Sequence, residues 1–149
     1  ESVLTAWAGM GRRNECPNGM RLTAWNGGMS VVRPDERIDP RNQRAPKNKD
    51  HYANLKAQAW FSLRARFENA YKKKTGREYD ATHIISLPAD LPYLEQLQDE
   101  LCQPHKKESG TGKVLVDKQP DGAQSPNLAD AVVMAFFPLS AKASILDVL

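Results

Sequence analysis

The sequence contains no long apolar run, and this absence argues against a membrane-spanning protein. No segment approaches the roughly 20 consecutive apolar residues that a membrane helix requires, and the start lacks a signal-peptide pattern. We therefore expect a soluble, cytoplasmic chain with no membrane contact. Its 149 residues, 40% of them hydrophobic, suffice for one core but not for two ordinary domains. The sequence predicts a single domain over 1–149, and a start at Glu1 rather than methionine fits a fragment better than an intact product.

Cysteine is scarce, which argues against a disulfide-built fold and against a structural zinc site. Cys16 and Cys102 lie far apart, and neither belongs to a CxxC unit. The three histidines also lack the spacing of metal ligands. The sequence therefore predicts two reduced thiols. A phosphate-binding loop is missing as well, because no GxxxxGK[ST] pattern occurs and "SGTGK" (109–113) is better explained as a hairpin turn.

Charge is present in quantity but is unevenly distributed. The net charge is +3, yet residues 51–77 carry seven Lys/Arg against one acid, and residues 78–149 carry five against eleven. A basic middle beside an acidic end is compatible with a nucleic-acid surface next to a cation-binding surface. The alternative is that "YKKKTGR" is only a solvated helix end, where lysines complement the helix dipole.

Hydrophobic periodicity predicts one long helix and several short elements. The apolar spacing from Leu55 to Tyr71 predicts an amphipathic helix over 50–74, capped by Asp50 and ended by three lysines and Gly76. "MRLTAWNGGMSVVR" (20–33) predicts a strand, a tight turn and a second strand. The proline-rich, charged stretch 34–49 is expected to be an exposed loop, and the most mobile segment.

The second half of the chain alternates between strand and helix patterns. "HIISLP" (83–88) predicts a buried strand, the leucines of 91–101 a short helix, and 101–118 a hairpin whose return strand is "KVLVDK". Pro126 opens a last helix that runs to Phe137. The expected class is α/β or α+β, with a mixed sheet flanked by the long helix and the C-terminal helix.

Asp130 is the only charge on this last, largely apolar helix, "SPNLADAVVMAFF". An ionised carboxylate withdrawn from water needs a cation, hydrogen bonds or a metal. One interpretation is therefore a ligand for Mg²⁺ or Mn²⁺. The other is an ordinary acid in a first helical turn, stabilised in part by the helix dipole. The pattern alone leaves both open.

Four motifs in order carry a family resemblance. The motifs are "KNKDHYANLKAQAWFSLRARFENAY", "ISLPADLPYLEQLQDEL", "KVLVDK" and "SPNLADAVVMAF". Together they resemble the C-terminal part of the nuclease domain of tailed-phage and prophage terminase large subunits, over about Met20 to Pro138. The resemblance implies a partial RNase H-like fold. It also implies metal-dependent endonuclease cleavage of concatemeric double-stranded DNA, and a portal or small terminase subunit as partner.

The resemblance further implies that Asp130 is the last of the family's metal-binding acids. The acids expected upstream are not visible, since Glu1 and Glu15 are unconvincing substitutes, and the ATPase half of the motor is missing. One carboxylate cannot hold two cations, so we expect a chain that is inactive alone, and whether it is an enzyme stays open. Asp117 and Asp121 are weak candidates for extra ligands, because surface acids explain them more simply.

Several lysines are candidates for DNA contact. They would neutralise phosphates without reading sequence. The candidates are Lys47, Lys49, Lys56, Lys72, Lys73 and Lys74.

Three hypotheses follow. The first is a prophage terminase nuclease fragment. The second is a non-catalytic RNase H-like module that binds DNA or packaging proteins through the 34–50 loop and the long helix. The third is an unrelated small α/β protein in which Asp130 is structural.

Overall fold

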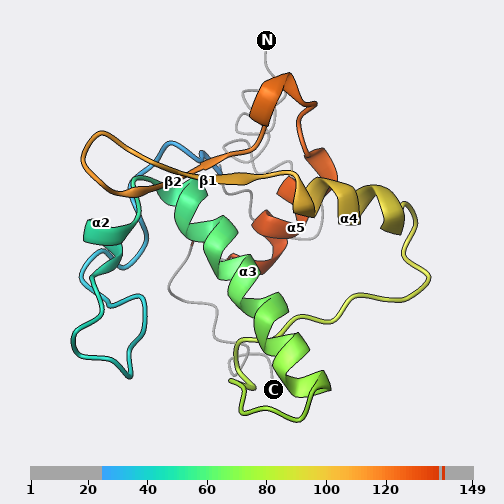
Figure 1. Cartoon of the computed structure of the whole chain (residues 1–149), viewed down its shortest axis with the longest axis horizontal. Coiled ribbons are helices and arrows are strands. Elements are labelled where there is room, and N and C mark those ends of the chain that lie inside the picture. The colour runs from blue at the N-terminus through green and yellow to red at the C-terminus, as the bar shows by residue number, and fades with distance from the viewer. Residues whose placement is uncertain (1–24, 138, 140–149) are drawn as a thin grey trace, which may run out of the picture.

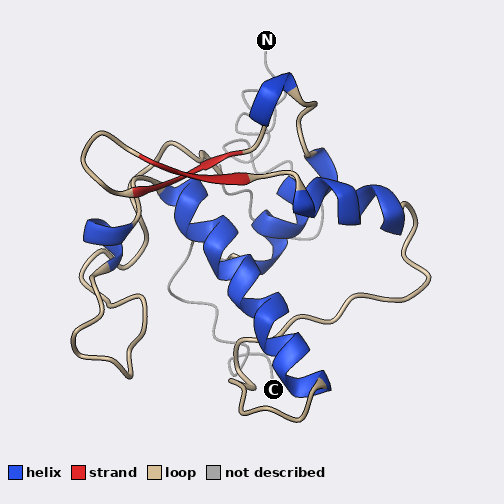
Figure 2. Ribbon diagram, in the orientation of Figure 1, coloured by secondary structure: helices blue, strands red, loops and turns tan. Residues whose placement is uncertain are grey.

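The central element of the chain is α3 (Leu55–Lys74), around which the other elements pack. The structure is a computed structural model, and it describes residues 25–137 and 139. In Figures 1 and 2 a β-hairpin crosses the first turns of α3, α4 and α5 lie to one side, and α2 (Asn48–His51) lies to the other. No helix of the described residues is long and apolar enough to cross a membrane.

The start of α3 is capped by Asn54, not by Asp50 as predicted. The Asn54 side chain accepts a hydrogen bond from the Ala57 N–H at 2.9 Å, which satisfies one of the free donors of a helix start. The predicted helix is interrupted because Tyr52 is extended and bridges to Val114, which ends α2 and separates it from α3. The part of the prediction before Leu55 was therefore wrong.

A tight turn at Asn26–Met29 packs directly against this helix start. The Met29 and Gly27 carbonyls accept hydrogen bonds from Leu55 N–H at 2.8 Å and Lys56 N–H at 2.9 Å. A Cβ atom at Gly27 would lie only 3.0 Å from the Lys56 Cβ, so the close approach favours glycine. The predicted turn is thus present, but residues 25–33 contain no strand, and 20–24 lie outside the described residues.

The end of α3 follows the prediction. Gly76 has a left-handed φ of 69°, and the N–H groups of Gly76 and Arg77 donate to the carbonyls of Lys73 at 3.2 Å and Lys72 at 2.9 Å. This pair of bonds is a Schellman motif, which satisfies two of the last free carbonyls.

The predicted strand at 83–88 is absent. Its first two carbonyls accept hydrogen bonds from side chains of α3 rather than from a neighbouring strand: the Asn69 amide donates to His83 O at 2.9 Å and Arg66 Nη1 to Ile84 O at 3.2 Å. Ile85 is nevertheless buried in the core, as the apolar pattern requires.

Three further elements agree with the sequence prediction. They are α4 (Leu94–Cys102), the hairpin of antiparallel strands β1 (His105–Glu108) and β2 (Val114–Asp117), and α5 (Asn127–Phe136). A short 3-10 helix (Pro120–Gly122), which the sequence did not predict, lies between β2 and α5. Val114 and Val116 of β2 are buried, whereas every residue of β1 is exposed, so the hairpin has one face on the core. The sheet of the described residues has these two strands only, rather than the larger mixed sheet expected.

The core is formed where α3 packs against β2 and α5, and α4 packs against α5. Its buried residues are Ala57, Ala59, Trp60, Leu63, Ile85, Leu97, Val116, Ala129 and Val133. Helix α5 is thereby fixed on two sides, which sets the position of Asp130.

The 34–49 segment is an irregular, mostly exposed loop outside this core. Ala45 is buried within it, and Arg37 bridges to Lys47 across it. These contacts fold the loop back on itself beside α2.

Candidate functional site around Asp130

Asp130 lies in the first turn of α5, and its side chain is only 15% exposed. Its backbone N–H donates to the Pro126 carbonyl at 2.9 Å, which is the hydrogen bond of the first helical turn. Burial on this scale requires a compensating partner for the carboxylate.

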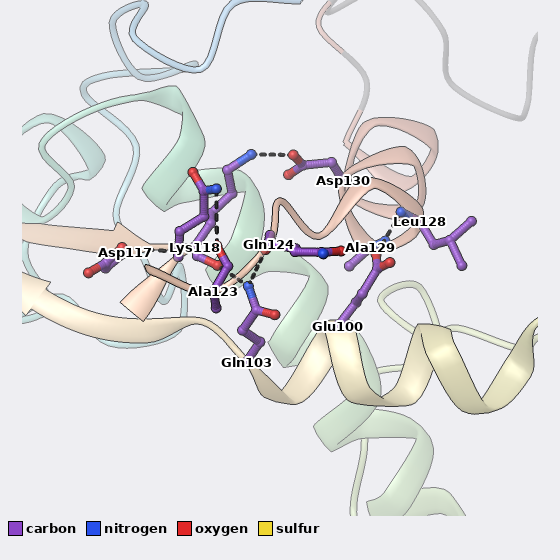
Figure 3. Close-up of polar contacts among 10 residues, drawn as sticks. Glu100, Gln103, Asp117, Lys118, Ala123, Gln124, Leu128, Ala129 and Asp130 are labelled. Atoms are coloured by element: carbon purple, nitrogen blue, oxygen red, sulfur yellow. Dashed lines mark hydrogen bonds and ion pairs between the residues drawn. The ribbon is translucent and has the colours of Figure 1, made fainter. Parts of the chain in front are cut away.

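The partner is Lys118, the residue that follows β2. Its Nζ donates to Asp130 Oδ2, and the lysine side chain is 22% exposed (Figure 3). Two opposite charges in contact and largely removed from water attract each other much more strongly than an exposed pair. The ion pair explains how an acid is tolerated on an apolar helix.

Gln103, just after α4, fixes the backbone on which Lys118 sits. Its side-chain amide donates to the Lys118 carbonyl and to the Gln124 carbonyl, the second at 2.8 Å. One amide therefore ties the end of β2 to the segment that leads into α5.

Glu100 of α4 caps the start of α5 (Figure 3). One carboxylate oxygen accepts from Leu128 N–H at 2.7 Å and from Ala129 N–H at 3.0 Å. Partial burial raises the pKa of Glu100, but the hydrogen bonds from Ala129 N–H, the Gln96 amide and Leu128 N–H together lower it more. The net pKa lies below its usual value. This negative charge at the positive end of α5 replaces a local cap, because Pro126 makes no side-chain capping bond.

Asp117 and Asp121, the other acids considered from the sequence that the structure describes, do not form a group of metal ligands with Asp130. Asp117 pairs with Lys107 at 2.6 Å and points away from Asp130 in Figure 3. The hydrogen bond from Lys107 lowers the pKa of Asp117. Asp121 lies in the turn before α5 with a left-handed φ of 55°. Glu1 and Glu15 lie outside the described residues.

The described residues therefore do not fit a two-metal centre. Within 25–137 and 139, no group of three or more His, Cys, Asp or Glu side chains is placed to hold a metal ion. The only charged partner of Asp130 in this part of the chain is a cation, Lys118. Cys102, also considered from the sequence, is a free and exposed thiol.

The lysines proposed for DNA contact lie in two groups at opposite ends of α3. Lys47 and Lys49, at the start of α2, both pair with Asp35, at 3.2 and 2.8 Å, and Lys56 lies in the first turn of α3. Lys72, Lys73 and Lys74 are exposed at the other end, about 24 Å further along the axis. The fold does not bring the six together into one patch.

Sequence reasoning missed Lys118, Glu100 and Gln103. Lys118 is 12 residues from Asp130 and Glu100 is 28 residues from Leu128, so periodicity within one element carries no signal for either contact. The only available signal was that "KVLVDK" ends in a lysine directly after a strand.

Comparison with solved structures finds the nuclease domain of the large terminase subunit gp2 of bacterial virus Sf6. The domain matches with a TM-score of 0.72 and 29% identity, over 89% of this chain and 61% of that one. A mutant of the same domain solved with manganese and beta-thujaplicinol matches with a TM-score of 0.73 and 26% identity, also over 89% and 61%. Another mutant, solved with calcium, matches with a TM-score of 0.71 and 29% identity, over 88% and 60%.

The chain thus spans about three fifths of the length of these structures. No family model matches the sequence. No curated protein matches it either. The structural similarity confirms the predicted resemblance and the partial RNase H-like fold, and it argues against an unrelated small α/β protein.

Proposed function

We propose that this chain is the C-terminal part of a prophage terminase nuclease domain, with little cleavage activity of its own. The observation that carries the proposal is Asp130. It occupies the first turn of α5, within "SPNLADA", where the resembling family has its last acid, and it belongs to no group of three or more possible metal ligands among the described residues. A lone acid paired with Lys118 suits a piece of a metal site better than a complete one.

For the complete domain, we propose metal-dependent endonucleolytic cleavage of concatemeric double-stranded DNA during packaging, in the host cytoplasm. The manganese and calcium of the similar structures support a divalent cation, and Mg²⁺ or Mn²⁺ is the proposed ion. A portal or small terminase subunit is the proposed partner. Of the described residues, only Asp130 would act as a metal ligand, so we assign this chain no catalytic step.

The test compares this chain with the protein encoded by its complete parent reading frame. With Mg²⁺ or Mn²⁺ and plasmid DNA, we expect cleavage by the longer protein and almost none by the chain. In the longer protein, Asp130→Asn should reduce the rate by more than the 10- to 100-fold loss typical of residues that only orient metal ligands. Asp121→Asn is the matched control. An unrelated domain upstream, or full activity in the Asp130→Asn protein, would contradict the proposal.

A second candidate function is a non-catalytic module that binds DNA or packaging proteins through the 34–50 segment and α3. Lys72, Lys73 and Lys74 favour it, because all three are exposed and none has an ion-pair partner within the described residues. Asp130→Ala separates the two candidates. Binding that survives this change, together with no measurable cleavage by either the wild-type chain or the longer protein, would favour the module.

A further inference from the structure

A cavity with several polar groups in its wall lies between α3 and the end of α5, away from the Asp130–Lys118 pair. It has a volume of about 250 Å³, and its walls come from α3, the 32–36 segment, the stretch after α3, and the end of α5. Phe136 is six residues beyond Asp130, about 9 Å along the helix axis. The side chains that matter here are Arg33, Ser62, Arg66, His83, Phe136 and Phe137.

Arg66 has unused hydrogen-bonding capacity in this cavity. Its Nη1 donates to the Ile84 carbonyl at 3.2 Å, and the guanidinium lies 5.8 Å from the centre of the Phe136 ring. Its Nε is buried, and within the described residues it has no hydrogen-bond partner and no carboxylate at ion-pair distance. An unsatisfied buried donor on a charged group is costly and needs an explanation.

Ser62 and His83 stand beside Arg66 as further polar groups. The Ser62 hydroxyl lies 3.4 Å from His83 Nε2. Burial lowers the pKa of His83, and the Arg66 charge lowers it further, against smaller opposing effects of Asp80 and Ser62. Burial likewise lowers the pKa of Arg66. An anion in the cavity would stabilise the cationic forms of His83 and Arg66.

The acids at and near the cavity already have partners. Glu36 and Arg33 both line the cavity and pair with each other at 3.5 Å, and both side chains are more than half exposed. Asp80 accepts from the Thr82 backbone at 2.9 Å and from its hydroxyl at 2.6 Å.

The amides in the wall are engaged too. The amide groups of Gln58 and Asn48 bond to backbone carbonyls of the 32–33 segment. Arg66 Nε therefore remains a donor without an acceptor among the described residues, and the Ser62 hydroxyl makes only its 3.4 Å contact with His83.

We propose that this cavity binds a phosphate group through the Arg66 guanidinium and the Ser62 hydroxyl, with His83 at its side. A planar guanidinium fork matches the oxygens of an oxyanion, and phosphate offers more acceptor oxygens than a carboxylate does. The volume exceeds the roughly 30 Å³ share of a water molecule several-fold, which leaves room for such a group. The source is either inorganic phosphate or the 5′-phosphate of a nucleic-acid strand. This site does not depend on the proposed nuclease function.

The test follows the His83 ring by NMR while inorganic phosphate is added to the full chain. A bound anion favours the protonated imidazole, so the His83 pKa should rise on addition. Arg66→Gln should weaken phosphate binding at least about tenfold, because it removes a charge-assisted hydrogen bond. Arg64→Gln is the matched control. It lies about 200° away around the same helix, is paired with Glu68 at 2.8 Å, and should leave the affinity unchanged.

Ser62→Ala provides a second variant in case loss of the Arg66–Phe136 contact unfolds the chain. It keeps the guanidinium in place and should weaken binding several-fold. A 5′-phosphorylated dinucleotide and its 5′-hydroxyl counterpart identify the source: a response to the first alone indicates a strand end, and a response to inorganic phosphate alone indicates the free anion. No change at His83 with any of the three, or equal phosphate affinity in the wild type, Arg66→Gln and Ser62→Ala, would overturn the proposal.

Discussion

Asp130 and Lys118 depend on each other, because each is a largely buried charge whose only ion-pair partner among the described residues is the other. The sequence left two interpretations of Asp130 open, a metal ligand or an ordinary acid of a first turn. The structure adds that Lys118 balances the charge of this acid. Stability measurements on this pair are therefore informative whether or not the chain is a nuclease.

We predict that Asp130→Asn destabilises the chain by about 1 to 3 kcal/mol, because Lys118 is left as a partly buried cation without its partner. Urea unfolding followed by circular dichroism measures the change. Adding Lys118→Met to Asp130→Asn should recover most of the loss, since the stranded charge is removed. Asp121→Asn is the control and should stay within about 0.5 kcal/mol, because its exposed turn conformation suits asparagine. Equal effects of Asp130→Asn and Asp121→Asn would contradict the ion pair.

Glu100 gives a prediction with a defined pH dependence. Replacement by glutamine should cost about 1 kcal/mol at pH 7, the usual value of a helix cap. The folded pKa of Glu100 lies below its unfolded value of about 4.3, so its stabilisation is complete above that value. It is lost as the pH falls through the folded pKa.

The difference between wild type and Glu100→Gln should therefore shrink in acid, as measured by unfolding at several pH values. Glu95→Gln, the same change on the exposed side of α4, should cost no more than a few tenths of a kcal/mol. A Glu100→Gln difference that stayed constant between pH 7 and pH 3 would show that its charge plays no part in the cap.

At the scale of elements, the start of α3 offers a direct choice between two caps. Asn54→Ala should destabilise the chain by about 1 kcal/mol, because the bond to Ala57 N–H is lost. Asp50→Ala should change stability by less than about 0.5 kcal/mol, since its side chain makes no capping bond. Thermal unfolding of the two variants side by side decides between them. If Asp50→Ala destabilised the chain more than Asn54→Ala, the result would indicate that the helix begins at Asp50, as the sequence predicted.

The sequence could predict the elements whose signals are local, and it could not predict those that depend on distant contacts. The body and end of α3, α4, the hairpin and α5 follow from spacing and end signals within about 20 residues, and those were correct. The start of α3 depends on Tyr52 meeting Val114 and on a turn near Gly27, contacts that local periodicity cannot register. The 83–88 segment has the composition of a strand, but Asn69 and Arg66 of α3 donate to its first two carbonyls.

For the site, the position of Asp130 was predictable and its surroundings were not. The apolar helix identified the acid, but its contacts with Lys118 and the Glu100 cap arise only when β2, α4 and α5 pack together. The cavity around Arg66 was missed for the same reason. Its groups come from α3, the segment after it and α5.

At the scale of the whole molecule, the separation of the lysines into two groups predicts unequal contributions to DNA binding. Replacing Lys72, Lys73 and Lys74 together with glutamine should reduce the slope of log affinity against log salt by up to about 3, near 0.9 for each phosphate contact. Lys47→Gln with Lys49→Gln should reduce the slope less, because Asp35 already pairs with both. Fluorescence anisotropy at several salt concentrations measures the slopes.

Circular dichroism should confirm that the triple variant keeps α3, since these lysines also complement the end of the helix dipole. A larger loss of slope from the Lys47 and Lys49 changes would place the DNA at the other end of the helix. An unchanged slope in both variants would exclude these five lysines from DNA contact.

The cap that Glu100 places on α5 also bears on the order in which the chain folds. An isolated ten-residue helix is marginal in water, and this one receives the acceptor for its first N–H groups from a residue 28 positions earlier. A peptide spanning 124–139 should therefore stay mostly unfolded, and α5 should become persistent only after α4 has formed and docked. Asp130 would then reach its final position late in folding, after the helix that carries Glu100.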